Sequence, residues 1–328
     1  MEAKIVSITR PDVQEWEQLW NSCPYATYFH SPEWAHIWQH YSEGKISPAP
    51  VLLAFNDGKK ALLPFSIEKA CKGLVKSTLS SPAGTYGGWI STDRLAPEHE
   101  KSVWQYILRE YPNLIIRTNP YYANNSAVPV VPCMDDVTHH VPMDGPFEKI
   151  EKEWRKGHRS AVHKAARLGV TVREASSMND WETYGLLYKD SLRRWGERAS
   201  SNYRQSLFSI MGSLNSSRIK LWLAQYEGNI VAGALCLYSR HHVVYWHGAA
   251  LDKYYFLNPV NYLVYDIMMK ASREGYAWFD FNPSAGHAGV IKFKQGFNPR
   301  ISSCPVYITQ TFSKRLYCMF SSRIGGNK

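Results

Sequence analysis

The sequence predicts an α/β protein of the α+β type, built from two tandem units that each contain a mixed, mostly antiparallel sheet flanked by helices. Three observations support this prediction. The chain has 328 residues, which is about two domain lengths at roughly 150 residues each. Amphipathic helical stretches alternate with short apolar strands in both halves. Tight turns between successive strands, such as Asn56-Asp57-Gly58, indicate hairpins and exclude an all-parallel sheet.

The first half begins with helix signals and continues with strands. Asp12 and Ser31 are suitable caps, and Pro32 fits the first position of the helix that follows Ser31. In order, we expect helices after Asp12 and after Ser31, a hairpin of strands at 50–55 and 61–66, a glycine-rich stretch at 83–89, a helix at 97–110 and a strand at 113–117.

The second half repeats this pattern. In order, we expect helices near 146–167, 179–194 and 202–213, strands at 218–225, 230–238 and 242–248, a helix at 259–274 and a strand at 277–281. Asn119-Pro120 and Asn282-Pro283 each follow a helix and a strand, which favours an internal repeat. Residues 119–145 have no helical period and four prolines, so we interpret them as a linker or edge strand and place the domain boundary near 145.

Charge and cysteine content narrow the class of protein. Lysine and arginine number 38 against 28 acidic residues, a formal net charge of +10 that favours anionic partners such as phosphates, nucleic acid or an acidic membrane face. The six cysteines are scattered without a CxxC pair, so no zinc site or disulfide framework is indicated. There is no apolar signal core and no run near 18 apolar residues, so we expect a cytoplasmic protein.

The segment 155–167 carries five fixed positive charges and no acid. Arg155, Arg159, His163 and Arg167 recur every four residues, so a helix would align them on one face, where like charges repel. A bound anion would offset that repulsion, and Arg159 and Lys164 are candidate residues for binding it. The alternative interpretation is a solvated helix face without a ligand.

Residues 279–297 are chemically the most informative part of the chain. Asp280 stands in an apolar, aromatic strand, where an ionised carboxylate is costly unless it is paired. Lys292 and Lys294 alternate with apolar residues, so an extended backbone would place both ammonium groups on one side. Acyl transfer to an amine needs a donor aimed at the developing oxyanion, which a lysine at a strand end can supply. Alternatively, Asp280 pairs structurally with a nearby Lys or Arg.

Two further stretches combine aromatic residues with glycine. Tyr245-Trp246-His247-Gly248 ends a strand, and Tyr86-Gly87-Gly88 stands at the comparable place in the first half. Glycines there let the backbone approach a ligand closely, so Tyr86, Gly87, Tyr245 and His247 are candidate substrate-binding residues. His247 is a candidate proton acceptor, with a structural histidine as the alternative. No GxxxxGK[ST], GxSxG, post-strand GxGxxG or HExxH motif occurs, so nucleotide hydrolysis, serine hydrolysis, Rossmann chemistry and a metal site are unsupported.

Taken together, several motifs resemble those of one family. In order they are Phe29-His30-Ser31-Pro32-Glu33-Trp34, Tyr86-Gly87-Gly88, Arg159-x4-Lys164-Ala165-x3-Gly169-Val170, Val231-Ala232-Gly233-Ala234, Tyr245-x2-Gly248-Ala249, Asn258-Pro259, Phe279-Asp280-Phe281-x2-Ser284 and Gly289-x3-Phe293-Lys294-x-Gly296-Phe297. Their order and spacing resemble Fem-type proteins, the FemA/FemB-like branch of the GNAT acyltransferase superfamily, over almost the whole chain.

The resemblance implies two tandem GNAT-like domains, at 1–145 and 146–328, with a substrate cleft between or beside them. The best-known Fem-type proteins move an aminoacyl group from aminoacyl-tRNA to an amine of a peptidoglycan precursor. Others resemble acyltransferases of polysaccharide or small-molecule pathways. The implied function is acyl or aminoacyl transfer onto an amine of a cell-envelope or polysaccharide precursor, with no bound cofactor or metal.

The motif match also assigns roles to single residues. Lys294 would be the positive group next to the reacting acyl carbonyl, and Phe293 would position it. Asp280 would act in the same pocket as the second candidate catalytic residue. Ser284 would help to shape that pocket, and Lys292 would act on substrate binding.

The identity of the acyl donor and the functional class of the protein both stay open. The donor is a polyanion, either aminoacyl-tRNA or acyl-CoA. The [QR]xxGx[GA] loop that cradles the CoA pyrophosphate in ordinary GNAT enzymes is absent, which counts against routine use of acetyl-CoA. Asn282-Pro283 replaces the Gly-Arg that often follows the Phe-Asp-Phe strand in the family, so one anion contact is lacking.

A CoA-dependent N-acyltransferase is the alternative enzyme, and a non-catalytic nucleic-acid-binding protein is the alternative from another class.

The C-terminal segment 311–324 has an apolar stripe at helical spacing, basic residues and no acid. One hypothesis is that it lies in an anionic membrane surface, which would make the protein peripheral to the membrane. The simpler alternative is that the stripe packs against the second domain.

Overall fold

The computed structural model describes residues 2–70, 73–123, 129, 132–196, 199, 201–284 and 286–311. The chain forms two compact units. The first comprises the residues up to Asp136 and those from Ser303 onward, and the second runs from Val137 to Ser302. The predicted α/β class, with mixed and mostly antiparallel sheets flanked by helices, is confirmed in both units.

These units divide the chain differently from the boundary predicted near residue 145. Strand β8 (Val137–Pro142) pairs with β13 (Trp278–Asp280) of the second unit. Near the other end, β15 (Val306–Ile308) pairs with β7 (Leu114–Arg117) of the first unit. Both pairings join residues more than 130 positions apart, and such contacts leave no trace in local sequence patterns.

The first unit contains two sheets. A three-stranded sheet has the order β1-β3-β4, and a five-stranded sheet has the order β15-β7-β6-β5-β2. The bounds of the strands not yet given are β1 (Ile5–Thr9), β2 (Ile46–Pro48), β3 (Val51–Phe55), β4 (Lys60–Leu63), β5 (Ser66–Ala70) and β6 (Val75–Leu79). Strands β3 and β4 confirm the predicted hairpin, and β6 and β7 form the parallel pair of this unit.

The helices of the first unit agree with the sequence. They are α1 (Val13–Ser22), η1 (Tyr28–His30), α2 (Pro32–Tyr41), η3 (Pro82–Gly84) and α3 (Pro97–Glu110). Asp12 caps α1 by accepting from the Glu15 amide, and Ser31 caps α2 by accepting from the Trp34 amide. Both caps satisfy a backbone donor that the first turn of a helix leaves unpaired, which is why these residues mark the helix starts.

The second unit is built on one seven-stranded sheet in the order β14-β8-β13-β12-β11-β10-β9. The bounds of its other strands are β9 (Thr171–Glu174), β10 (Ile219–Tyr226), β11 (Asn229–Tyr238), β12 (His242–Ala250) and β14 (Arg300–Ser303). Strands β12 and β13 are parallel, whereas β13–β8 and the pairs from β9 to β12 are antiparallel.

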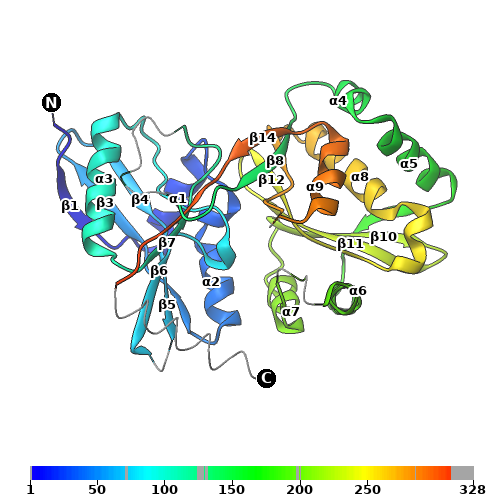
Figure 1. The fold of residues 1–328 in the computed structure, drawn as a ribbon, viewed down its shortest axis with the longest axis horizontal. Helices are drawn as coiled ribbons and strands as arrows, with labels where there is room; N and C mark the ends of the chain where they lie inside the picture. The colour runs from blue at the N-terminus through cyan, green and yellow to red at the C-terminus, as the bar shows by residue number, and fades with distance from the viewer. Residues whose placement is uncertain are drawn as a thin grey trace. The chain divides into compact units, whose positions relative to one another are not determined.

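Helices cover both faces of this sheet (Figure 1). One face carries α4 (Phe147–Glu153), α5 (Lys156–Arg167), α8 (Pro259–Arg273) and α9 (Ala288–Lys294), with the short helices η5 (Asp252–Leu257) and η6 (Gln295–Phe297). The opposite face carries α6 (Met178–Trp195) and α7 (Gln205–Ser213). The helix predicted at 259–274 and the strands predicted at 218–225, 230–238 and 242–248 are therefore confirmed.

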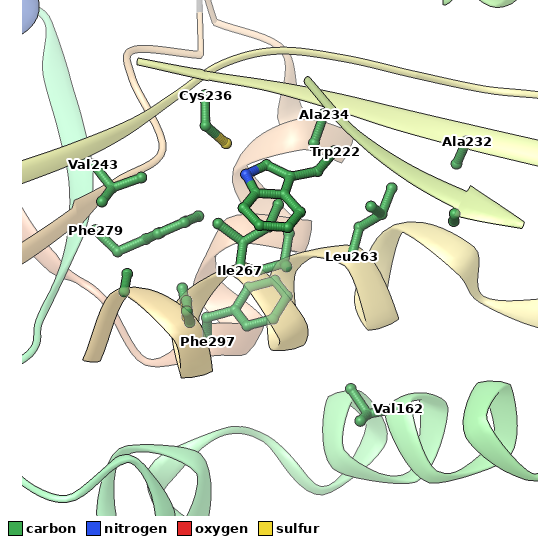
Figure 2. Packing of buried hydrophobic residues seen from close by; sticks show 14 of the residues in the cluster. Val162, Trp222, Ala232, Ala234, Cys236, Val243, Leu263, Ile267, Phe279 and Phe297 are labelled. Atoms are coloured by element: carbon green, nitrogen blue, oxygen red, sulfur yellow. The ribbon is translucent and has the colours of Figure 1, made fainter. Parts of the chain in front are cut away.

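The main core of the second unit lies between the sheet and α8. Figure 2 shows the Trp222 ring projecting from β10 toward Leu263 and Ile267 of α8, with Phe297 beneath them. The Trp222 indole donates to the Tyr238 hydroxyl at 2.9 Å, so its polar edge is satisfied inside the core. This packing fixes α8 against the strands β10 to β13.

The predicted helical region 146–167 is interrupted at Trp154. The residue has extended backbone angles, and its ring packs against Phe147 of α4 and Phe297 of η6. The next amide, of Arg155, donates to the carbonyl oxygen of Gly296 at 2.9 Å. Burial of the tryptophan and this long-range hydrogen bond outweigh the local helical preference, so α4 and α5 are separate helices.

Two sequence-based expectations concern the C-terminus and the membrane. The predicted apolar stripe at 311–324 lies outside the described residues from 312 onward. Within the described ranges, no helix is long and apolar enough to cross a membrane.

The ion pair at the start of α6 gives a stability prediction. Both guanidinium nitrogens of Arg173 donate to the Asp180 carboxylate, at 2.6 and 2.9 Å, and the Ser176 amide donates at 2.8 Å. The hydrogen bonds from Arg173 hold the pKa of Asp180 well below its usual value. Because the folded-state pKa is depressed, the stabilisation is complete above the unfolded value near 4 and is lost as the pH falls below it.

We therefore expect Asp180→Asn to lower the free energy of unfolding at pH 7 by about 1–2 kcal/mol, and by less at pH 3. Urea titrations at both pH values measure this difference. Asp190→Asn, which loses more exposed pairs with Arg193 and Arg194 on the same helix, is the control and should cost less than about 0.5 kcal/mol. Equal losses at pH 3 and pH 7 would contradict the pH dependence.

Candidate active site at the end of strand β13

The parallel strands of the second unit part after a short pairing. Strand β12 pairs with β13 from His242 opposite Trp278 to Val244 opposite Asp280, and β12 then continues to Ala250. Its register with β11 shifts between Tyr245 and His247, so β12 bulges just beyond this point. In α/β sheets, ligands commonly bind beyond the carboxyl ends of strands where neighbours diverge.

Asp280 is the last residue of β13 and is fully buried. One of its oxygens accepts hydrogen bonds from the Thr138 hydroxyl at 2.6 Å and the Asn282 amide at 2.7 Å. The second bond closes a tight turn that holds Asn282 at φ 61°, a conformation that asparagine tolerates better than most residues. The carboxylate thus shapes the chain directly after β13.

Lys294 is the last residue of α9 and is only 4% exposed. Its ammonium group donates to the Asn282 carbonyl oxygen at 2.6 Å. A buried ammonium needs hydrogen-bond acceptors in place of water, and the turn set by Asp280 presents one. The structure therefore brings Asp280 and Lys294, both predicted from the sequence, to the same strand end.

The expectation that Lys292 and Lys294 extend from one side of a strand is wrong. Residues 288–294 form α9, in which positions two apart point in nearly opposite directions. Lys292 is consequently exposed, while Lys294 is buried. Apolar and charged residues alternate over only four positions here, and a pattern of that length fits a short helix as well as a strand.

Phe293 of α9 is held in place by His158 of α5. The His158 Nε2–H donates to the Phe293 carbonyl oxygen at 3.0 Å, and the His158 ring packs against Phe293 and Phe297. Burial lowers the pKa of His158, which favours the neutral ring that this packing needs. The predicted positioning role of Phe293 thus has a physical basis in the α5–α9 contact.

Three buried polar groups near this strand end have no hydrogen-bond partner among the residues that the structure describes. They are the Ser284 hydroxyl, the Asn282 side-chain carbonyl and the His139 Nδ1. Buried polar atoms are normally paired, so such a group suggests a place for a bound ligand or water. Ser284 was predicted from the sequence, whereas Thr138, His139 and Asn282 were not assigned a role there.

Part of this site, from Asp280 to Lys294, lies in a stretch that is similar to a known family domain. Residues 152–294 match the acetyltransferase (GNAT) domain. The match lies within the second unit and ends at Lys294. A search of curated proteins by sequence gives no match.

Solved structures resemble the whole chain. The structure of FemX superposes with a TM-score of 0.71 at 14% identity, covering 96% of this chain and 99% of that one. L-PGS from Bacillus licheniformis gives a TM-score of 0.53 at 14% identity, with coverages of 97% and 98%. The C-terminal domain of a putative lysylphosphatidylglycerol synthetase from Agrobacterium fabrum gives 0.51 at 10% identity, with coverages of 88% and 96%. The Fem-type resemblance found in the sequence is thereby confirmed for the fold of both halves.

Among the other predicted residues of the second unit, His247 lies on the opposite face of the sheet, under α6 and α7. His247 lies among aromatic residues of α6 and α7, with the Tyr188 ring centroid 4.5 Å away, and its Nδ1 is hydrogen-bonded to the Tyr184 hydroxyl. Burial lowers the pKa of His247 to about 3. These contacts favour the structural interpretation of His247. Tyr245 is nearer the site, since its ring centroid is 6.2 Å from that of Phe281, and burial raises the pKa of its hydroxyl.

The basic segment 155–167 forms α5, as its charge spacing predicted. Val162 and Ala165 pack into the core, whereas Lys164 and Arg167 are exposed and Arg159 is half-buried. Among the described residues, no carboxylate forms an ion pair with any of the five fixed charges of this segment. The basic face of α5 is therefore open to an anionic ligand.

Tyr86 and Gly87 belong to the first unit. Tyr86 is fully buried and packs edge-on against Phe29 at 5.6 Å. Gly87 borders a small hollow whose other lining residues are Gly88, Trp89, Trp104, Ile116, Thr118, Asn119 and Tyr122. A substrate role for these two residues stays a prediction. No group of three or more His, Cys, Asp or Glu side chains in the described ranges is placed to hold a metal ion.

Two glycines, Gly289 in the first turn of α9 and Gly296 just after the helix, test how closely this segment packs against His158. A methyl group added at Gly296 would collide with the His158 ring, whereas one added at Gly289 would meet nothing within 4 Å. We expect Gly296→Ala to lower the free energy of unfolding by about 1–3 kcal/mol through this clash. Gly289→Ala, the matched control, should be neutral or stabilise by up to about 1 kcal/mol. Similar urea midpoints for the two variants would contradict the described packing of His158.

Proposed function

We propose that the protein is an acyl- or aminoacyltransferase that forms an amide on an amine of a cell-envelope or polysaccharide precursor. The observation that carries this proposal is the buried ammonium of Lys294, placed where β12 and β13 part within the GNAT domain. A buried cation beside buried polar groups without partners suits a reaction in which negative charge develops on a carbonyl oxygen.

In this mechanism, Lys294 stabilises the oxyanion that forms when the acceptor amine attacks the acyl carbonyl. The ammonium is already fixed by the Asn282 carbonyl, so little reorganisation is needed when the charge develops. The Ser284 hydroxyl is positioned to donate to the same oxygen or to orient the substrate. Asp280 acts through the turn at Asn282, as a positioning residue for Lys294.

The donor in this proposal is aminoacyl-tRNA, a polyanion that the exposed basic face of α5 would attract. Acyl-CoA is the second candidate, because it too is polyanionic and the matched family domain is named for acetyl transfer. Both donors occur in the cytoplasm, where we place the reaction. The Fem-type resemblance supports the proposed acceptor class, and one structural neighbour is named as a putative lysylphosphatidylglycerol synthetase.

The catalytic assignment is tested by removing the charge of Lys294. With amino-acid-charged tRNA or acetyl-CoA as donor and a lysine-containing peptidoglycan stem peptide as acceptor, we expect Lys294→Met to slow transfer about 10²–10³-fold. Lys292→Met, two positions away and exposed, should lose less activity than Lys294→Met and act mainly through a higher KM, as expected of a residue that affects substrate binding. A folded Lys294→Met protein with nearly wild-type turnover would show that the lysine is not catalytic.

The role of α5 is tested by charge reversal. We expect the double variant Arg159→Glu, Lys164→Glu to bind tRNA more weakly and to reduce the slope of log affinity against log salt by about 1–2. The control is Lys189→Glu, Arg193→Glu on α6, which covers the opposite face of the sheet. An unchanged slope in the α5 variant would indicate a solvated face. A wild-type protein that binds tRNA but transfers no acyl group would favour the alternative of a non-catalytic nucleic-acid-binding protein.

A further inference from the structure

We propose that His139 of β8 is the catalytic base that takes the proton from the attacking amine at the β13 site. The inference rests on the proposed function and adds to it the one group that acyl transfer to an amine needs and that the sequence left unidentified. Residues 119–145 were interpreted as a linker or edge strand, so His139 received no role there.

The register of β8 places His139 beside the residues of the site. Its carbonyl oxygen accepts from the Phe281 amide at 2.9 Å, directly before the turn at Asn282 that receives the Lys294 ammonium. His140, the next residue, is the Cα partner of Asp280. His139 and Lys294 therefore act on the same short stretch of chain, 281–282, from β8 and α9 respectively.

Strand alternation determines which face His139 occupies. Val141 and Phe279 are paired, and both belong to the core that α8 covers. His139 lies two residues before Val141, so its side chain is on this same face, in line with Phe281. This is the face that carries α9 (Figure 1), the helix that ends at Lys294. His140 points to the other face, where its ring packs against Trp278 at 4.8 Å.

His139 is 2% exposed, and its Nδ1 has no hydrogen-bond partner in the part of the chain that the structure describes. In the same unit, His158 is bonded to a carbonyl oxygen and His247 to a tyrosine hydroxyl. A buried imidazole without such a bond loses hydrogen bonds that water would supply. A substrate N–H directed at the ring would restore one of them.

The surroundings keep this ring unprotonated near neutral pH. Burial lowers the pKa of His139 and the charge of Lys294 lowers it further, whereas Asp280 raises it. His140 on the same strand is itself shifted toward the neutral form by burial, and Arg300 on the neighbouring strand β14 acts in the same direction. A base must be unprotonated before it can accept a proton, so this balance fits the role.

The step is balanced in atoms and charge. The amine lone pair forms the C–N bond at the acyl carbon while the carbonyl π electrons move to oxygen, which faces Lys294. The nitrogen loses a proton to the unprotonated His139 ring nitrogen. When the carbonyl re-forms, the bond from carbon to the ester oxygen of tRNA, or to the thioester sulfur of CoA, breaks. The imidazolium then gives the proton to that leaving atom.

The decisive variant is His139→Asn, with His140→Asn on the opposite face as the control. With charged tRNA or acetyl-CoA and the stem peptide, we expect kcat/KM of the wild type to fall as the pH drops through the titration of the histidine. His139→Asn should transfer at least about 10²-fold more slowly and lose that acidic limb, while His140→Asn keeps the limb. If the wild type is active and His139→Asn keeps both the wild-type rate and the acidic limb, His139 is not the base. That result leaves the proposed function standing.

A second measurement does not depend on turnover. Nitrogen-15 spectra of histidine-labelled full-length protein should show His139 neutral at pH 7, and Lys294→Met should move its titration to higher pH because a nearby positive charge is removed. A ring that is protonated at pH 7, or a titration unaffected by Lys294→Met, overturns the inference. A wild type that transfers neither donor group refutes the proposed function, and the role of His139 with it.

Discussion

A lysine ammonium that is almost wholly removed from water needs oxygen atoms as hydrogen-bond acceptors. The turn at the end of β13 provides one. Asp280 draws the Asn282 amide back toward the strand, which turns the Asn282 carbonyl toward α9. Lys294 then donates to that carbonyl. Isolated buried charges are costly, so this arrangement is maintained only because α9 itself is fixed in place.

Contacts with α5 hold α9 in place. His158 of α5 donates to the Phe293 carbonyl, and the Arg155 amide donates to the carbonyl of Gly296 just after α9. The break between α4 and α5 makes the second of these bonds available, because Arg155 then lies outside helical hydrogen bonding. The helix that exposes basic side chains to solvent is thus also the one that seats the candidate catalytic lysine. An anion bound on α5, as we propose, would therefore lie on the same helix that contacts the residues on either side of Lys294.

Much of this could be predicted from the sequence, and the remainder has identifiable physical causes. Caps and turns act locally, so the helix starts after Asp12 and Ser31 and the hairpin at Asn56-Asp57-Gly58 could be read directly. The convergence of Asp280 and Lys294 was anticipated through the family resemblance. The helical state of 288–294 was missed because tertiary contacts with α5, rather than local periodicity, decide it. The role of β8 was missed because strand pairing over 140 residues leaves no local pattern, and the prolines of 119–145 concealed a strand of six residues.

The central claim is that the buried ammonium of Lys294 faces the reacting acyl group, and a complex with a stable donor analogue tests it most directly. Crystals of the protein with an amide-linked 3′-aminoacyl adenosine, or with a thioether analogue of acyl-CoA, would place the carbonyl oxygen of the analogue. We predict that this oxygen lies within hydrogen-bond distance, about 2.7–3.0 Å, of Lys294 Nζ in one of these complexes. An analogue bound elsewhere in the GNAT domain, with its carbonyl remote from Lys294, would contradict the account.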